Sequence, residues 1–246
     1  MMNIKHSKRI PILMYHSVDS IDRGKGLRSL HVPRWLFKLQ LSILYMLGYR
    51  GLDMDRLLPY LKGETTGKVF GITFDDGYEN NYLNALPILK KYKFTATCYL
   101  LANNIGGKNY WDIQKGFASH NMMTHEHIKN WITSGMSIGS HSLTHVKLAE
   151  LSKSMMKKEI LESKLKLEKE FKTKINHFCY PYGSFDDTTE EIVKIAGYDS
   201  AVTVVRGVES DSPNLFRLSR VFITHRTYPH LLLLKLFSSY EKRRKK

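Results

Sequence analysis

Aspartate and histidine side chains stand directly after several segments that have the composition of buried β-strands. Asp75 and Asp76 follow one apolar run, and His141 and His145 follow another. His16 comes directly after a third such run. Carboxylates and imidazoles are the groups that transfer protons and hold divalent metal ions in proteins. Their shared position after strands indicates a site of that kind, if the fold brings the strand ends together.

Each of these signals is weak when it is taken alone. An Asp-Gly pair after a strand is a common turn, and a lone His16 is more often a hydrogen-bonded structural histidine. Two histidines four residues apart arise easily by chance among 11 histidines in 246 residues. Residues 180–183 (Tyr-Pro-Tyr-Gly) have the composition of a rigid turn. The functional interpretation therefore depends on their occurrence together.

A second histidine pair, His125 and His127, offers a rival metal motif. The pair opens a segment with a helical pattern, and residues two apart on a helix point about 200° away from each other. We therefore expect a solvated first helical turn here and no metal site.

The chain alternates apolar runs of strand length with helical patterns. Helices are expected over residues 33–48, 81–92 and 124–134, and the clearest one begins near Ser152, with an apolar stripe at helical spacing. The expected strands are residues 10–15, 69–74, 95–101, 136–140, 177–180, 201–205 and 220–224. This alternation predicts an α/β fold, a parallel sheet or barrel that binds ligands at the carboxyl ends of its strands.

Composition indicates one ordinary globular domain over residues 1–246. Hydrophobic residues make up 42% of the chain, no linker or repeat divides it, and the two cysteines are too far apart for a CxxC motif. The apolar run near the start is too short for a signal peptide, so a cytoplasmic enzyme is expected. The formal net charge of +15, with a basic tail over residues 241–246, favours anionic partners. The segment 231–237 before this tail could anchor the protein peripherally to the cytoplasmic membrane, or could simply pack on the barrel.

Residues 73–77 (Thr-Phe-Asp-Asp-Gly), followed by residues 141–145 (His-Ser-Leu-Thr-His), resemble the polysaccharide deacetylase family, the NodB-homology or carbohydrate esterase 4 family. The resemblance extends over roughly residues 8–224. Residues 180–183 and 11–16 (Pro-Ile-Leu-Met-Tyr-His) are similar to the branch that contains poly-N-acetylglucosamine deacetylases. The resemblance implies a distorted (β/α) barrel of about seven strands that is circularly permuted.

The resemblance also implies a set of metal ligands. Asp76, His141 and His145 would hold one divalent metal ion through a carboxylate oxygen and two imidazole nitrogens. Zinc suits this ligand set best, while iron, cobalt, nickel and manganese are alternatives.

The remaining roles follow from the same resemblance. Asp75 would be the general base that takes a proton from the attacking water, and His16 would protonate the leaving amine. The backbone N–H of Tyr182 would hold the oxyanion, with Pro181 fixing the turn.

One position departs from the family pattern. Cys179 stands three residues before the tyrosine of the turn, where relatives carry an arginine that orients the base. Another residue must then hold Asp75. We expect Arg220 to do so, with Arg217 as the second candidate.

The leading functional hypothesis is a metal-dependent N-deacetylase acting on an amino sugar in a polysaccharide or a glycolipid. An O-acetyl carbohydrate esterase would use the same residues. The positive charge also suits phosphate-bearing lipid carriers, so a lipid-linked N-acetyl sugar is a candidate substrate. A basic nucleic-acid-binding protein is disfavoured, because no helix-turn-helix, RNA-binding aromatic motif or zinc-finger spacing occurs. A noncatalytic glycan-binding protein is disfavoured because base, ligands and acid are all present.

Overall fold

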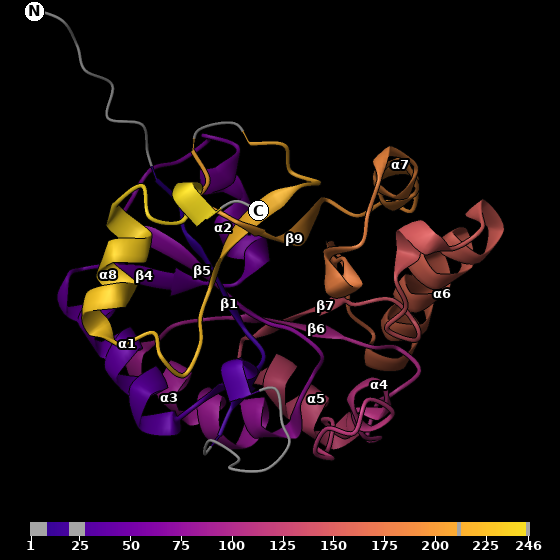
Figure 1. Cartoon of the computed structure of the whole chain (residues 1–246), viewed down its shortest axis with the longest axis horizontal. Helices are drawn as coiled ribbons and strands as arrows, with labels where there is room; N and C mark the ends of the chain where they lie inside the picture. The colour runs from indigo at the N-terminus through magenta and orange to yellow at the C-terminus, as the bar shows by residue number, and fades with distance from the viewer. Residues whose placement is uncertain (1–8, 20–27, 211–212, 245–246) are drawn as a thin grey trace, which may run out of the picture.

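Seven parallel strands close into a barrel in the computed structural model, which describes residues 9–19, 28–210 and 213–244. Each strand pairs with the next around a ring, and the pairing of β1 with β5 completes it (Figure 1). In ring order the strands are β1 (Ile12–Tyr15), β10 (Leu218–Phe222), β9 (Ser200–Arg206), β8 (His177–Cys179), β7 (Ser137–Ser140), β6 (Thr97–Leu100) and β5 (Val69–Phe74). The predicted α/β barrel of about seven strands is confirmed.

The first strand of the chain fills the gap between the last strand and an internal one. β1 pairs in parallel with β10 on one side and with β5 on the other, with Tyr15 opposite Phe74. Residues that follow β1 therefore reach the same end of the barrel as residues that follow β5. This arrangement places His16 beside Asp75 although 58 residues separate them in the sequence.

Three short strands were not predicted. β4 (Arg50–Leu52) pairs with the beginning of β5, while β2 (Ser17–Val18) and β3 (His31–Val32) form a separate parallel pair. Runs of two or three residues carry too little apolar periodicity to be recognised, and their pairing comes from neighbours distant in sequence.

Helices surround the barrel, and Figure 1 shows α6 and α7 on the side opposite α1 and α8. The predicted helices are present as α1 (Arg34–Met46), α3 (Leu86–Tyr92), which follows a π-helical turn at Asn81–Ala85, α5 (His125–Thr133) and α6 (Lys153–Phe171). Ser152 caps α6 by accepting a hydrogen bond from the backbone N–H of Met155. The predicted apolar stripe of α6, from Met156 to Phe171, is buried.

Four further α-helices of the described residues were not predicted. Two begin at a recognisable cap: Asp53 precedes α2 (Met54–Leu61), and Asp186 forms a capping box before α7 (Asp187–Ile195). The very short α4 (Tyr110–Ile113) lies between β6 and α5, and α8 (Pro229–Phe237) follows β10.

The segment before the basic tail packs on the barrel side. Leu232 and Leu236 of α8 are fully buried, whereas Leu234 and Phe237 are exposed. Part of the apolar face is therefore already covered by protein. Residues 245–246 of the tail lie outside the described residues, and its contact with a membrane stays a prediction.

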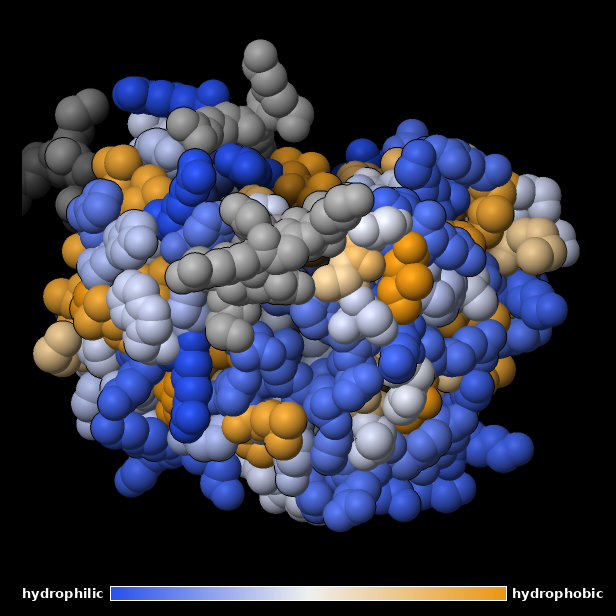
Figure 2. All heavy atoms as spheres, turned by 60° about the horizontal axis from the view of Figure 1, so that its bottom comes forward, coloured by the Kyte–Doolittle hydropathy of each residue, from blue (hydrophilic) through white to orange (hydrophobic). Residues whose placement is uncertain are grey.

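Exposed apolar residues are dispersed on the face seen in Figure 2, where hydrophobic groups occur in separate clusters among hydrophilic ones. Among the residues that the structure describes, no helix is both long and apolar enough to cross a bilayer.

Candidate active site

Asp76, His141 and His145 converge at the carboxyl ends of β5 and β7. The Nε2 atoms of both histidines lie 3.3 Å from Oδ1 of Asp76, and all three side chains are buried. One ligand atom from each residue fits within a group no more than 4.8 Å across. This is the buried cluster of one carboxylate and two imidazoles that the resemblance implies.

Backbone strain is concentrated in this cluster and its neighbours. Six non-glycine residues of the described chain have positive φ, and two of them, Lys93 and Lys172, are ordinary helix C-caps. The other four belong to the site: Asp76, Ser142, His145 and Tyr182. Left-handed backbone at such residues costs about 1–3 kcal/mol each and persists where the surroundings enforce it, typically at functional sites.

The donor set fits a divalent metal ion. Nδ1 of His141 lies 2.8 Å from the carbonyl oxygen of Cys179, to which it can donate its proton, so Nε2, on the side of Asp76, is the nitrogen that could bind a metal ion. Burial would raise the pKa of Asp76, but the facing imidazoles of His141 and His145 hold it well below its ordinary value. An ionised carboxylate and an unprotonated Nε2 are the forms that bind metal.

Asp75 lies beside the cluster in a buried ion pair with Arg220. Both carboxylate oxygens accept a hydrogen bond of 2.7 Å from the guanidinium, and Arg220 is fully buried. Burial would raise the pKa of Asp75, but the charge and hydrogen bonds of Arg220 lower it below its ordinary value. Asp75 is therefore ionised and rigidly oriented.

Arg220 reaches Asp75 from the middle of β10, between Leu218 and Phe222. Its Nε donates to the carbonyl oxygen of Thr203, and NH2 also lies 3.4 Å from Sγ of Cys179. The second candidate, Arg217, instead lies on the surface and pairs with Glu190 and Asp187.

His16 borders the same cavity from the end of β1. Its Nε2 lies 3.8 Å from Oδ2 of Asp75, and its side chain is 14% exposed. Nδ1 of His16 is buried without a hydrogen-bond partner among the described residues. The imidazole is therefore close to the carboxylate while one edge remains accessible from the cavity.

Tyr182 lies at the opposite rim, in the turn that follows β8. Its ring lies 4.4 Å from that of His145, and Nζ of Lys115 lies 3.3 Å from its hydroxyl. Its φ of 57° and the preceding Pro181 set the direction of its backbone N–H. Within the part of the chain that the structure describes, this N–H donates to no protein acceptor.

Glu159 of α6 supports the histidine loop and was not predicted. Its carboxylate accepts hydrogen bonds from the backbone N–H groups of Leu143 and Thr144 and from the Thr144 hydroxyl. Glu159 is 7% exposed and sits on the buried stripe of α6, between Met156 and Ile160. An acid on an apolar helix face was the available sequence signal.

The rival histidine pair does not converge. His125 and His127 open α5, as predicted; the first contacts Glu170 on the surface, and the second forms a capping box with Thr124 and stacks on Tyr82.

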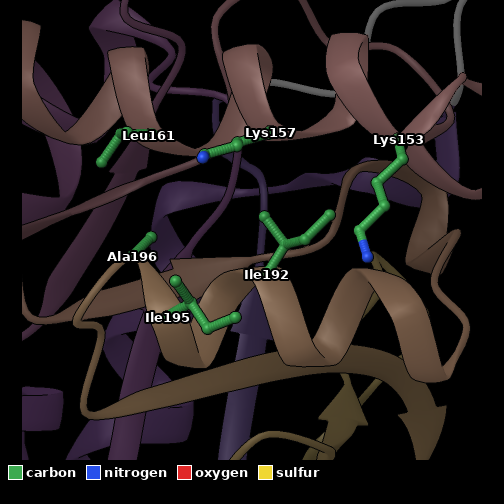
Figure 3. Close-up of a pocket in the computed structure, with 6 residues that line it drawn as sticks. All are labelled: Lys153, Lys157, Leu161, Ile192, Ile195 and Ala196. Atoms are coloured by element: carbon green, nitrogen blue, oxygen red, sulfur yellow. The ribbon is translucent and has the colours of Figure 1, made fainter.

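A separate apolar hollow lies between α6 and α7. Figure 3 shows Lys157, Leu161 and Ile192 directed into it from the two helices. The lining contains no acid and no histidine. The chemistry-bearing residues lie instead around the cavity at the barrel mouth, which is lined by His16, Leu30, Asp75, Asp76, Trp111, Asp112, His141, His145, Tyr180, Tyr182 and Val204.

A parallel barrel with buried acids and histidines at the carboxyl ends of its strands defines a (β/α)-barrel enzyme. Residues 62–201 match the sequence profile of the family described as polysaccharide deacetylase. The chain is 31% identical over 218 residues to the Bacillus subtilis protein YxkH, which bears the name of a polysaccharide deacetylase, covering 88% of this chain and 72% of that protein. This chain belongs to the polysaccharide deacetylase family and is a carbohydrate deacetylase.

Three further relatives are informative. The chain is 26% identical over 219 residues to a poly-beta-1,6-N-acetyl-D-glucosamine N-deacetylase of Staphylococcus aureus, covering 85% of this chain and 73% of the relative. The solved structure of the Streptococcus pyogenes deacetylase PplD in complex with acetate superimposes with a TM-score of 0.81 at 29% identity, over 94% of this chain and 99% of that one. The structure of IcaB from Ammonifex degensii, at 24% identity, shares the fold with a TM-score of 0.78, over 94% of this chain and 98% of that one.

Proposed function

We propose that this enzyme removes N-acetyl groups from amino sugars of a polysaccharide, with a divalent metal ion held by Asp76, His141 and His145. The observation that carries this proposal is the group of three ligand atoms within 4.8 Å, with Asp75 and His16 beside it. The relative named as a poly-N-acetylglucosamine N-deacetylase supports the amide substrate.

Three protein ligands would leave positions on a divalent ion for water and a substrate oxygen. Two imidazole nitrogens and one carboxylate oxygen suit zinc, while iron, cobalt, nickel and manganese accept the same donors. A divalent ion bound there would polarise the acetamide carbonyl and lower the pKa of the attacking water.

In this proposal Asp75 acts as the general base. It is ionised at neutral pH, so it can accept a proton, and it is not one of the three proposed ligands. The two Arg220 hydrogen bonds fix the carboxylate plane, and each oxygen keeps a further lone pair. Arg220 thus acts as a positioning residue for the base.

In this proposal His16 acts as the general acid. It lies beside Asp75 and borders the cavity. An amine is a poor leaving group unless it is protonated, so hydrolysis of an amide needs a proton donor at this position. On the opposite rim, the backbone N–H of Tyr182 would stabilise the oxyanion.

The test is acetate release from oligomers of N-acetylglucosamine in β-1,6 and β-1,4 linkage and from O-acetylated oligomers. Each substrate is assayed with the enzyme as prepared, after chelation, and after zinc, cobalt or manganese is restored. We expect release from an N-acetylated oligomer that chelation abolishes and metal restores. Release from O-acetylated substrates alone would show an esterase instead, and release that survives complete metal removal would refute the metal site.

A further inference from the structure

The cavity at the barrel mouth contains a further carboxylate, Asp112, that the roles above do not use. Asp112 belongs to α4 and is only 5% exposed, yet it lines the same cavity as Asp76 and His145. No Lys, Arg or His of the described chain lies within 4 Å of its carboxylate. A buried carboxylate without an ion pair is costly, which indicates that it serves a ligand.

Only one oxygen of Asp112 is held by protein. Oδ2 accepts a hydrogen bond of 3.1 Å from the hydroxyl of Tyr78 and a longer one of 3.4 Å from Nδ2 of Asn109. The hydrogen bonds that the carboxylate accepts from the described residues all go to Oδ2, and Oδ1 accepts none. The carboxylate is thus held by one oxygen, with the other left for a ligand in the cavity.

Aromatic side chains flank this part of the cavity. The ring of Trp111 lies 4.5 Å from that of His145, and the ring of Tyr182 lies 4.4 Å from the same histidine. Both aromatic residues line the cavity together with Asp112. A sugar ring has apolar C–H faces and a polar rim of hydroxyl groups. A cavity lined by aromatic side chains and by one carboxylate oxygen without a protein partner complements such a ring.

We propose that Oδ1 of Asp112 accepts a hydrogen bond from a ring hydroxyl of the amino sugar whose acetamido group is hydrolysed, and so selects a sugar over other acetylated compounds. This inference rests on the proposed function, because it assumes that an amino sugar enters this cavity. A hydroxyl donating to a carboxylate makes one of the stronger hydrogen bonds found in proteins, and its loss leaves the buried charge unpaired.

The first experiment compares Asp112→Asn with the unchanged enzyme on two acetyl donors, an N-acetylglucosamine oligomer and 4-nitrophenyl acetate, which carries no sugar hydroxyl. We expect kcat/KM on the oligomer to fall about 10- to 100-fold, as for loss of a hydrogen bond to a charged group. Activity on the ester and the metal content should stay within about twofold. Asp55→Asn, at the other end of the barrel, is the matched control and should leave kcat/KM unchanged on both substrates.

An equal fall on both substrates, or a loss of bound metal, would show that Asp112 acts through His145 or through the fold, and would overturn the inference. Monodeoxy N-acetylglucosamine oligomers sharpen the test. One of them should lower the activity of the unchanged enzyme about as much as Asp112→Asn does, and should lower that of Asp112→Asn little further. Full additivity for every hydroxyl position would also overturn the inference.

Calorimetric binding of the oligomer to metal-free protein separates this inference from the proposed function. Asp112→Asn should weaken binding about 10- to 100-fold, even if the enzyme proves to hydrolyse a different acetyl linkage. Unchanged binding would refute the role of Asp112. Absence of acetate release from every N-acetylated sugar by the unchanged enzyme, with sugar binding intact, would refute only the proposed function.

Discussion

At the amino ends of the barrel strands, His177 lies between Ser200 and Asp55 much as the site histidines face Asp76 at the carboxyl ends. Nδ1 of His177 lies 2.9 Å from the Ser200 hydroxyl, and Nε2 lies 3.1 Å from Oδ1 of Asp55. His177 is 1% exposed and Ser200 is fully buried. Both nitrogens of this imidazole are satisfied by protein, so none remains for a ligand.

The carboxyl end uses the same residue types in a different way. His141 and His145 both direct Nε2 at one oxygen of Asp76, and the Nδ1 atoms of His145 and His16 have no partner among the described residues. The backbone there is strained, whereas His177, Ser200 and Asp55 have ordinary φ. Convergence of ligand atoms and ring nitrogens without protein partners therefore distinguish the proposed active site from a structural network of the same residue types.

The largest expected effect is that of His141→Ala at the carboxyl ends of the barrel strands, and His177→Ala at the amino ends is its comparison. His141→Ala should lose bound metal and lower acetate release by about 10³-fold or more, because the ion supplies several kcal/mol of stabilisation. His177→Ala should keep its metal and lower the free energy of unfolding by about 1–3 kcal/mol, because buried partners lose their hydrogen bonds. Elemental analysis, activity and denaturant unfolding measure the three effects. Full metal occupancy in His141→Ala would contradict the ligand assignment.

The next substitution separates two adjacent aspartates at the carboxyl end. Asp75→Asn should retain metal while acetate release falls by about 10²–10⁴-fold, since the general base is lost but the ligands remain. Asp76→Ala should lose metal as well. The metal content of both variants shows which aspartate is the ligand and which is the base. Equal metal loss in both would mean that the two roles are misassigned.

A smaller effect is expected for His16→Ala. Turnover of an N-acetylated sugar should fall by about 10²-fold, whereas an activated ester should be affected much less, because its leaving group needs little proton donation. Steady-state rates of His16→Ala and the unchanged enzyme on the two substrates show whether the amide is affected more than the ester. A uniform fall on both would place His16 outside the role of general acid.

Arg220→Lys should have a milder effect than loss of the base. Lysine keeps the positive charge but cannot make the two parallel hydrogen bonds to Asp75, so we expect activity to fall about tenfold with metal retained. Arg217→Lys is the matched surface control and should leave activity unchanged. Equal rates for Arg220→Lys and the unchanged enzyme would show that the paired geometry is not needed.

The smallest effect concerns pH and the amino end. Burial would raise the pKa of Asp55, but the hydrogen bond and charge of His177 lower it below its ordinary value of 3.8. A carboxyl with a lowered pKa in the folded state stabilises the protein above its unfolded pKa and loses that contribution as the pH falls through the folded pKa. Asp55→Asn should therefore reduce stability at neutral pH by less than about 1 kcal/mol and flatten the loss below about pH 4. Denaturant unfolding at several pH values measures the free energy of unfolding of both proteins. If its dependence on pH is the same in Asp55→Asn and in the unchanged enzyme, the Asp55–His177 pair does not contribute to it.

Much of the fold was predictable because the barrel strands are buried on both faces. Residues 69–74 were predicted as a strand with the bounds that the structure shows, since a continuous apolar run bounded by polar residues is a strong local signal. Helix α6 was predictable from its cap and stripe. Short elements such as β4 and α4 were not, because their formation depends on neighbours far away in the chain.

The sequence by itself determined which residue types follow which strands, and hence the positions of Asp75, Asp76, His141 and His145. Local composition is sufficient for that, because each motif is contiguous with the strand that carries it. Only the tertiary structure decided that Arg220 pairs with Asp75 across 145 residues, that Glu159 holds the histidine loop, and that Asp112 opens into the same cavity. These contacts join separate elements, and closure of the barrel, which no local pattern encodes, sets their distances.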